Sequence, residues 1–147
     1  MTAKLSFAGR KAQSGVMLLE ALIGILIFSL GILALVGMQG LAVRLSTDAR
    51  ERAEASNLAS QIVGEMWLNR TNLANYAYAG SGTPPTELTT WVAQVEAQLP
   101  DAAANRPVIT IAPSAMVDAG TETTVTLRWK TPSDAQIHQF IMTAYIN

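Results

Sequence analysis

Glu20 is the residue of this chain whose chemical setting is most unusual. From Ala21 to Val43 the sequence carries no charged side chain, so the Glu20 carboxylate stands at the entrance of a run of 23 uncharged residues. A carboxylate is costly to desolvate, and a buried one is tolerated when a positive charge meets it. Glu20 is therefore the first candidate for a functional role in this sequence.

The uncharged run is long enough to cross a membrane. As an α-helix it would rise roughly 35 Å, whereas the hydrocarbon core of a bilayer is about 30 Å thick. Lys4, Arg10 and Lys11 precede the run, and the basic and acidic residues that follow it balance, which favours a cytoplasmic N-terminus. The run is about twice as long as the apolar core of a secretory signal. A plain anchor would explain its length but not Glu20.

Catalytic and metal-binding patterns are missing from the sequence. The chain has one histidine, His138, and no cysteine, and it contains no zinc-protease, serine-hydrolase or phosphate-loop motif. Beyond residue 15 there are seven basic and eleven acidic side chains, which is not the balance of a nucleic-acid-binding protein. We predict that the chain is not an enzyme, that it has no cofactor or metal site, and that His138 is a surface or partly buried structural residue.

The first half of the chain is predicted to form one long helix, from Val16 to about Asn72. The sequence has no proline before Pro84. Beyond the uncharged run, apolar residues recur at helical spacing and predict a stripe that packs on a sheet. The residues of this predicted stripe are Leu45, Ala49, Ala53, Leu58, Ile62, Met66 and Leu73.

The second half is predicted to form a loop, a short helix and three strands. Gly, Ser and Pro residues mark a loop over residues 75–85. An amphipathic helix over residues 86–99 carries Trp91 on its apolar face, where we expect a core anchor, and Pro100 ends it. Alternating residues predict strands at about 108–112, 122–130 and 136–146. The predicted fold class is α+β, with the long helix packed on a small antiparallel sheet.

The beginning of the chain resembles the class III signal of type IV prepilins and pseudopilins. The resemblance rests on the basic leader, Gly15, the apolar block and Glu20, although Val16 and Met17 stand where the family usually has Phe and Thr. It implies that prepilin peptidase cleaves between Gly15 and Val16 and methylates the new N-terminus at Val16. It also implies that Glu20 pairs with the α-amino group of a neighbouring subunit.

The same resemblance implies a pilin-like domain organisation. Residues 1–15 would be the leader peptide, and residues 16–43 the transmembrane or filament-core half of the long helix. Residues 44–147 would form the periplasmic globular domain. The precursor would then be a single-pass protein of the bacterial inner membrane, with its N-terminus in the cytoplasm, before it enters a pilus.

Three later stretches resemble PilV-type minor pilins of the type IV pilus. They are Leu58–Arg70, which ends in Met, two residues and then Asn-Arg, the Leu-x-x-Trp to Leu-Pro pattern of residues 88–100, and Thr124–Trp129. The implied function is a minor pilin that primes pilus assembly and so supports adhesion and twitching motility. The implied partners are prepilin peptidase, other minor pilins, the major pilin, the inner-membrane assembly platform, a tip adhesin and, before assembly, membrane lipid.

Two other functions stay open at this point. A minor pseudopilin of a type II secretion system would share the leader and the architecture. A membrane-anchored binding or sensor domain, left unprocessed, belongs to a different class and would keep residues 1–15.

Overall fold

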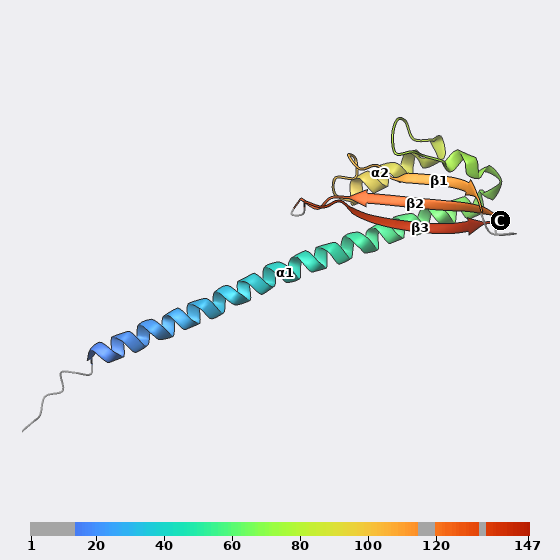
Figure 1. Ribbon diagram of the computed structural model, residues 1–147. Helices are drawn as coiled ribbons and strands as arrows, with labels where there is room; N and C mark the ends of the chain where they lie inside the picture. Colours follow the sequence, from blue (N-terminus) through green and yellow to red (C-terminus); the bar gives the residue numbers. More distant parts are fainter. Residues whose placement is uncertain (1–13, 115–119, 133–134) are drawn as a thin grey trace, which may run out of the picture. The chain divides into compact units, whose positions relative to one another are not determined.

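The computed structural model describes residues 14–114, 120–132 and 135–147, so the predicted leader lies outside them up to residue 13. The chain divides into two compact units, residues 1–46 and 47–147, which are described separately below. The expected α+β class is confirmed, because a long apolar helix packs on a small antiparallel sheet of three strands. Figure 1 shows the element order, with the C-terminus directly after the last strand.

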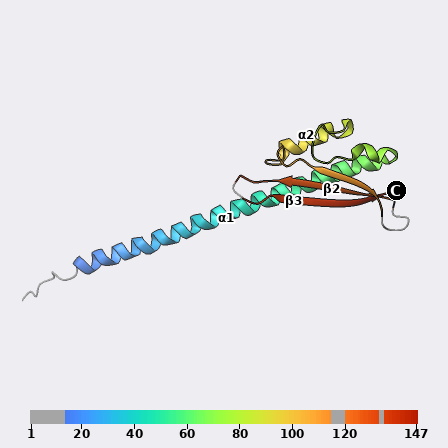
Figure 2. The same cartoon turned by 45° about the horizontal axis from the view of Figure 1, so that its top comes forward.

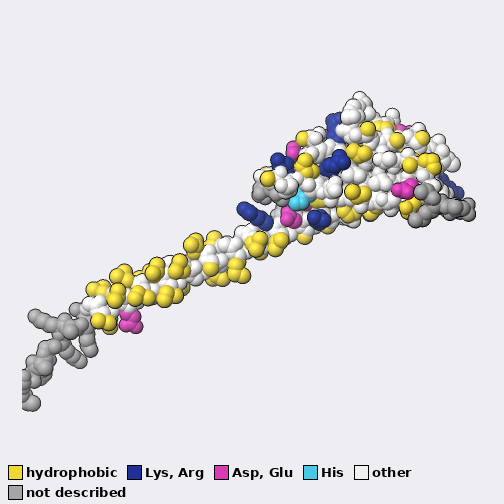
Figure 3. Space-filling model, in the orientation of Figure 1, with side chains coloured by type: hydrophobic (Ala, Val, Ile, Leu, Met, Phe, Trp, Pro, Cys, Tyr) yellow, Lys and Arg dark blue, Asp and Glu magenta, His cyan; other side chains and the backbone are white. Residues whose placement is uncertain are grey.

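Helix α1 spans Ser14–Leu68 and contains no proline. Its side chains are exposed from residue 15 to residue 46, and hydrophobic side chains cover the surface of this part in Figure 3. By length and composition α1 is able to cross a membrane, and it is the only such helix among the described residues. The apolar run therefore forms the expected helix.

The predicted end of the long helix, at about Asn72, is wrong by one turn. The helix α1 stops at Leu68, and Asn69 takes a non-helical backbone conformation before the 3₁₀ helix η1 at Arg70–Tyr76. The predicted loop over residues 75–85 consequently starts later, and Tyr76 and Tyr78 are buried in the core. Burial of these aromatic rings explains why the chain remains ordered here, because each buries a large apolar area.

The predicted short helix is confirmed, but its first turn is a 3₁₀ helix. Element η2 covers Thr86–Leu88, and α2 follows at Thr89–Gln98. The Leu99 amide still bonds to the Val95 carbonyl, and Pro100 then prevents continuation of the helix. Trp91 is 2% exposed, so it is the core anchor that its position predicts.

The sheet has the order β1-β2-β3, with both pairs antiparallel. Its strands are β1 at Val108–Pro113, β2 at Thr121–Trp129 and β3 at His138–Ile146. The alternation of β2 is confirmed, since Val125, Leu127 and Trp129 are buried. Lys130, predicted to end this strand, leaves the ladder because its amide bonds to the Pro100 carbonyl.

One hydrophobic core joins the elements of the second unit. In Figures 1 and 2 the C-terminal part of α1 runs behind the strands, and α2 lies beside it. The buried apolar residues are Ala55, Leu58, Ala59, Ile62, Met66, Leu73, Tyr76, Tyr78, Leu88, Trp91, Val92, Val95, Leu99, Ala102, Ile109, Val125, Leu127, Trp129 and Ile146.

The predicted packing stripe of α1 is partly wrong. Leu58, Ile62, Met66 and Leu73 are buried as predicted, but Leu45, Ala49 and Ala53 are exposed. Ala53 and Leu58 are five residues apart, which places them about 140° from each other around the helix. Leu45 and Ala49 likewise lie more than about 130° from Leu58, so the three exposed residues are on the side of α1 opposite its buried face.

Gly120 is the glycine that this fold requires most strongly. It has a positive φ of 71°, and a Cβ at this position would collide with the Ile146 carbonyl and lie 2.9 Å from the Asn147 Cα. Its own carbonyl accepts a hydrogen bond from the Ser114 amide, which joins the facing ends of β1 and β2. A side chain at residue 120 would therefore push the ends of β2 and β3 apart.

We expect Gly120→Ala to lower the free energy of unfolding by about 2–4 kcal/mol, from backbone strain and overpacking together. Gly82→Ala is the matched control, since Gly82 also has a positive φ of 76° but a Cβ there would meet nothing within 4 Å. It should cost only the backbone strain, about 1–2 kcal/mol. Denaturant unfolding followed by tryptophan fluorescence measures the free energy of unfolding of both variants. Equal losses of stability in the two variants would show that a Cβ at residue 120 does not collide with its neighbours.

Candidate functional site

The predicted processing site lies in the first turns of α1. Gly15 and Val16 are helical, and the Val16 side chain is 66% exposed. A Cβ at Gly15 would meet nothing within 4 Å, and its φ is not in the left-handed region. The fold therefore does not itself require glycine at residue 15.

Glu20 shares one face of α1 with Val16, one helical turn before it. Leu19, Ile23 and these two residues line the same shallow hollow on the helix. Among the described residues no hydrogen bond or ion pair is made by the Glu20 carboxylate, whose residue is exposed. The carboxylate is therefore free to meet a positive group of another molecule.

Ser29 shows how a polar side chain in this run forms a hydrogen bond within its own helix. Its hydroxyl donates a hydrogen bond to the Ile25 carbonyl, one turn earlier, over 2.7 Å. A serine hydroxyl can return to the helix backbone in this way, whereas a carboxylate only accepts hydrogen bonds and the helix carbonyls offer none. Glu20 and Ser29 thus differ in their need for an external partner.

The apolar surface around Glu20 is large. Nineteen large hydrophobic side chains between Val16 and Leu45 are exposed, with exposed fractions from 47% at Ile32 to 74% at Met17. Exposed apolar area costs about 25 cal/mol per Å² in water. This half of α1 requires lipid or other apolar helices around it.

In the second unit, two buried tryptophans fix the contacts of α1. The Trp91 indole donates to the Leu58 carbonyl over 2.9 Å and ties α2 to α1. The Trp129 indole donates to the Glu51 carboxylate over 2.8 Å, and the Thr131 hydroxyl donates to the same oxygen over 2.9 Å. Glu51 therefore holds the end of β2 against α1.

The sequence did not predict that Glu51 binds Trp129 and Thr131. These contacts join positions 78 and 80 residues apart, and an isolated glutamate on a polar helix face carries no signal of such a distant partner. His138 is partly buried, as predicted, and its ring stacks on Trp129 at a centroid distance of 5.8 Å. The contact with Trp129 gives His138 a structural role.

A polar hollow lies beside Glu51, between α1 and the end of α2. It is lined by Thr47, Arg50, Glu51, Glu54 and residues 96–101. At its rim, Glu96 forms an ion pair with Arg106 over 3.0 Å, and Arg106 also donates to the Gly82 carbonyl. The Tyr78 hydroxyl and then Glu96 raise the pKa of Arg106 above its ordinary value. These contacts fasten the loop before β1.

The described residues contain no group of three His, Cys, Asp or Glu side chains placed to hold a metal ion. The structure thus defines an α+β protein with one membrane-length helix, and within the described residues the apolar surface before residue 46 and the Glu20 carboxylate on it are unpartnered. A comparison with known protein families, curated proteins and solved structures finds none that matches this chain.

Proposed function

We propose that this chain is a minor pilin of the type IV pilus that helps to prime pilus assembly. The observation that carries the proposal is Glu20, an unpartnered carboxylate at the start of an exposed apolar helix, five residues after a glycine that the fold does not require. An ordinary anchor needs neither residue. An assembly subunit needs both, the glycine for cleavage by the peptidase and Glu20 for the axial register of the subunits.

Processing precedes assembly in this proposal. Prepilin peptidase hydrolyses the Gly15–Val16 peptide bond on the cytoplasmic face of the inner membrane, and the new α-amino group of Val16 is methylated. Glycine at residue 15 leaves this bond without a side chain on one side, where the peptidase must approach the backbone. The products are the leader, residues 1–15, and a mature chain that begins at the helix.

Assembly then exchanges lipid for protein around the apolar helix. The helix leaves the bilayer laterally and packs among the helices of other subunits. Four glycines of the mature helix lie before the second unit, at residues 24, 31, 37 and 40, and a Cβ at any of them would meet nothing within 4 Å, so they leave space for neighbouring helices to approach. The Glu20 carboxylate meets the α-amino group of an adjacent subunit, and this pair sets the axial register.

The proposed partners follow from this sequence of steps. Before assembly they are the peptidase, the inner-membrane platform and lipid, with the second unit in the periplasm. In the fibre they are other minor pilins and the major pilin, and a tip adhesin where one is displayed. The proposed role has no catalytic turnover and requires no cofactor.

The experiment compares cells that lack this chain with cells that express it. We expect sheared surface fibres from the expressing cells to contain the chain, and cells without it to lose most of their pili and their twitching motility. Type II secretion should be unchanged. Normal piliation with impaired secretion would identify a pseudopilin instead, and no effect on either would leave the unprocessed anchor.

A further inference from the structure

The two edge strands of the sheet differ in whether another segment forms backbone hydrogen bonds with their outer side. The outer edge of β1 is met by Tyr78, whose amide and carbonyl exchange hydrogen bonds with Ile109 over 3.0 and 2.8 Å. Strand β3 pairs with β2 on its inner side. On the outer side of residues 139–146, the described part of the chain supplies no strand or backbone hydrogen bond. A row of backbone donors and acceptors is therefore left to solvent.

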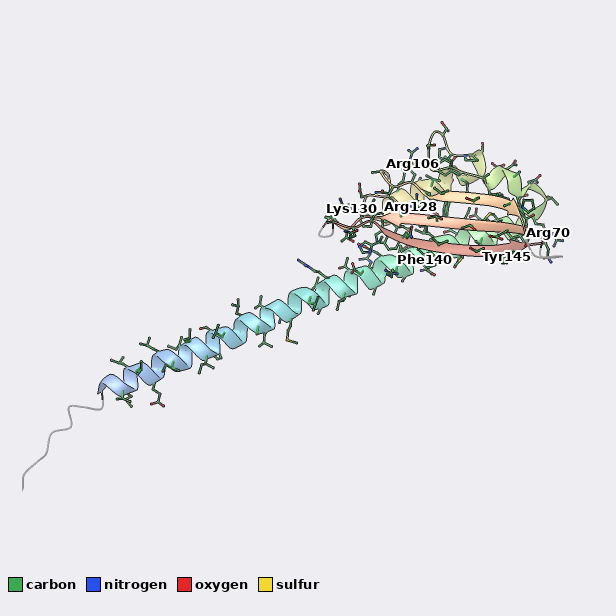
Figure 4. The ribbon with its side chains drawn as sticks, viewed as in Figure 1. Arg70, Arg106, Arg128, Lys130, Phe140 and Tyr145 are labelled. Atoms are coloured by element: carbon green, nitrogen blue, oxygen red, sulfur yellow. The ribbon has the colours of Figure 1, made fainter. Side chains whose placement is uncertain are left out.

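Burial of the side chains falls off toward this edge. On the face that packs on α1, Val125 and Leu127 of β2 are 0% exposed, whereas Phe140 and Met142 of β3 are only partly buried. On the opposite face, Ile141 is 53% and Tyr145 is 39% exposed. Figure 4 marks Phe140 and Tyr145 on the outermost strand. A strand laid beside β3 would cover apolar side chains on both faces.

Strand β3 lacks the features that usually protect an edge. Soluble proteins protect exposed edge strands with charged side chains, prolines or β-bulges. Residues 139–146 contain neither a charge nor a proline, and all nine residues of β3 pair with β2 without a bulge. The strand is thus a ready template for one more strand.

We propose that the outer edge of β3 binds an extended, uncharged segment of a partner protein, with apolar side chains at alternate positions, as a fourth strand of the sheet. Backbone hydrogen bonds would supply affinity, and contacts with alternate side chains would supply specificity. The partly buried Phe140 and Met142 call for the apolar side chains of the segment on their face of the sheet. The open face, where the exposed Thr143 lies between Ile141 and Tyr145, accepts its uncharged polar side chains.

A second copy of this chain does not fit the edge. Antiparallel pairing of two β3 strands about an axis normal to the sheet would make the second-unit parts of α1 run in opposite directions in the two copies, which the common direction of subunits in the proposed fibre excludes. Parallel pairing about an axis along the strands would turn one sheet over relative to the other. The face covered by α1 in one copy would then continue into the open face of the other, so the apolar faces of the two copies would not form one surface. The proposal concerns the second unit alone, so it does not depend on cleavage at Gly15.

The test uses the full chain in detergent micelles and a synthetic peptide of nine residues, the length of β3, that alternates valine and threonine. The peptide is blocked at both ends and carries a fluorophore. We expect saturable binding by fluorescence anisotropy, with empty micelles as the baseline. A peptide with N-methyl groups on alternate amides, which cannot complete the ladder, should bind at least about tenfold more weakly.

The matched variants place one lysine on each edge strand, on the same open face. Ile141→Lys on β3 should weaken peptide binding about tenfold or more, whereas Thr110→Lys on β1 should leave it unchanged. Both side chains are exposed, so both variants should unfold at the wild-type denaturant concentration. No saturable binding up to millimolar peptide, equal effects of the two lysines, or insensitivity to N-methylation would each overturn the proposal.

Discussion

Glu20→Gln should reduce incorporation of this chain into surface fibres roughly a hundredfold while leaving its amount in the membrane unchanged. Removing one partner of a buried ion pair costs about 3–5 kcal/mol, because the other charge stays buried and unpaired. Such a cost corresponds to a factor of roughly 10²–10⁴ in an equilibrium constant, of which the low end is expected here. Glu20 is exposed and makes no hydrogen bond or ion pair with the residues that the structure describes, so we expect the fold itself not to respond. Quantitative immunoblots of sheared fibres and membrane fractions measure the two amounts.

Ser29→Ala is the control for this experiment. Ser29 is also a polar residue in the apolar run, but its hydroxyl is already bonded to the Ile25 carbonyl, so its loss should leave incorporation within about twofold. If the Glu20 variant entered fibres as well as the Ser29 variant does, the carboxylate would have no assembly role.

The second large effect concerns the stability of the globular unit. We expect Trp91→Ala to lower the free energy of unfolding by about 3–5 kcal/mol. Trp91 is 2% exposed in the centre of the core, and its indole is bonded to the Leu58 carbonyl, so truncation leaves a cavity and breaks the link between α2 and α1. Trp91→Phe keeps much of the packing and removes the hydrogen bond, and it should cost less than the alanine variant. Denaturant unfolding of the detergent-solubilised chain provides the measurement.

Trp67→Ala provides the comparison for Trp91→Ala. Trp67 lies on the same helix as Leu58 but is 42% exposed, so its truncation should cost under about 1 kcal/mol. A similar loss for the two alanine variants would show that the core is not organised around Trp91.

Local patterns predicted the elements of this fold well. The alternation along β2 identified its buried face, and the apolar stripe of residues 88–99 with Pro100 located α2 and its anchor. The packing stripe of α1 was predicted on the wrong side for its first part, although the helical period could have shown this. Ala53 lies five residues before Leu58, about 140° away around the helix, whereas Ala55 lies three residues before Leu58 and shares its face. Spacings of four and five residues in succession do not stay on one face of a helix.

The candidate site was only partly accessible to sequence reasoning. Glu20 was identifiable because a charge in an apolar run is conspicuous whatever the fold. The structure adds that its carboxylate has no partner among the described residues and that Gly15 has no steric role. The contact of Glu51 with Trp129 and the open edge of β3 depend on which elements become neighbours, so no local pattern could reveal them.

The most direct test of the pilin proposal is the N-terminal sequence and intact mass of the chain extracted from cells with and without prepilin peptidase. The account predicts a mature chain that begins at N-methylated Val16 when the peptidase is present, and the full precursor when it is absent. A chain that keeps residues 1–15 in peptidase-positive cells would contradict the account and would leave a membrane anchor with a globular domain.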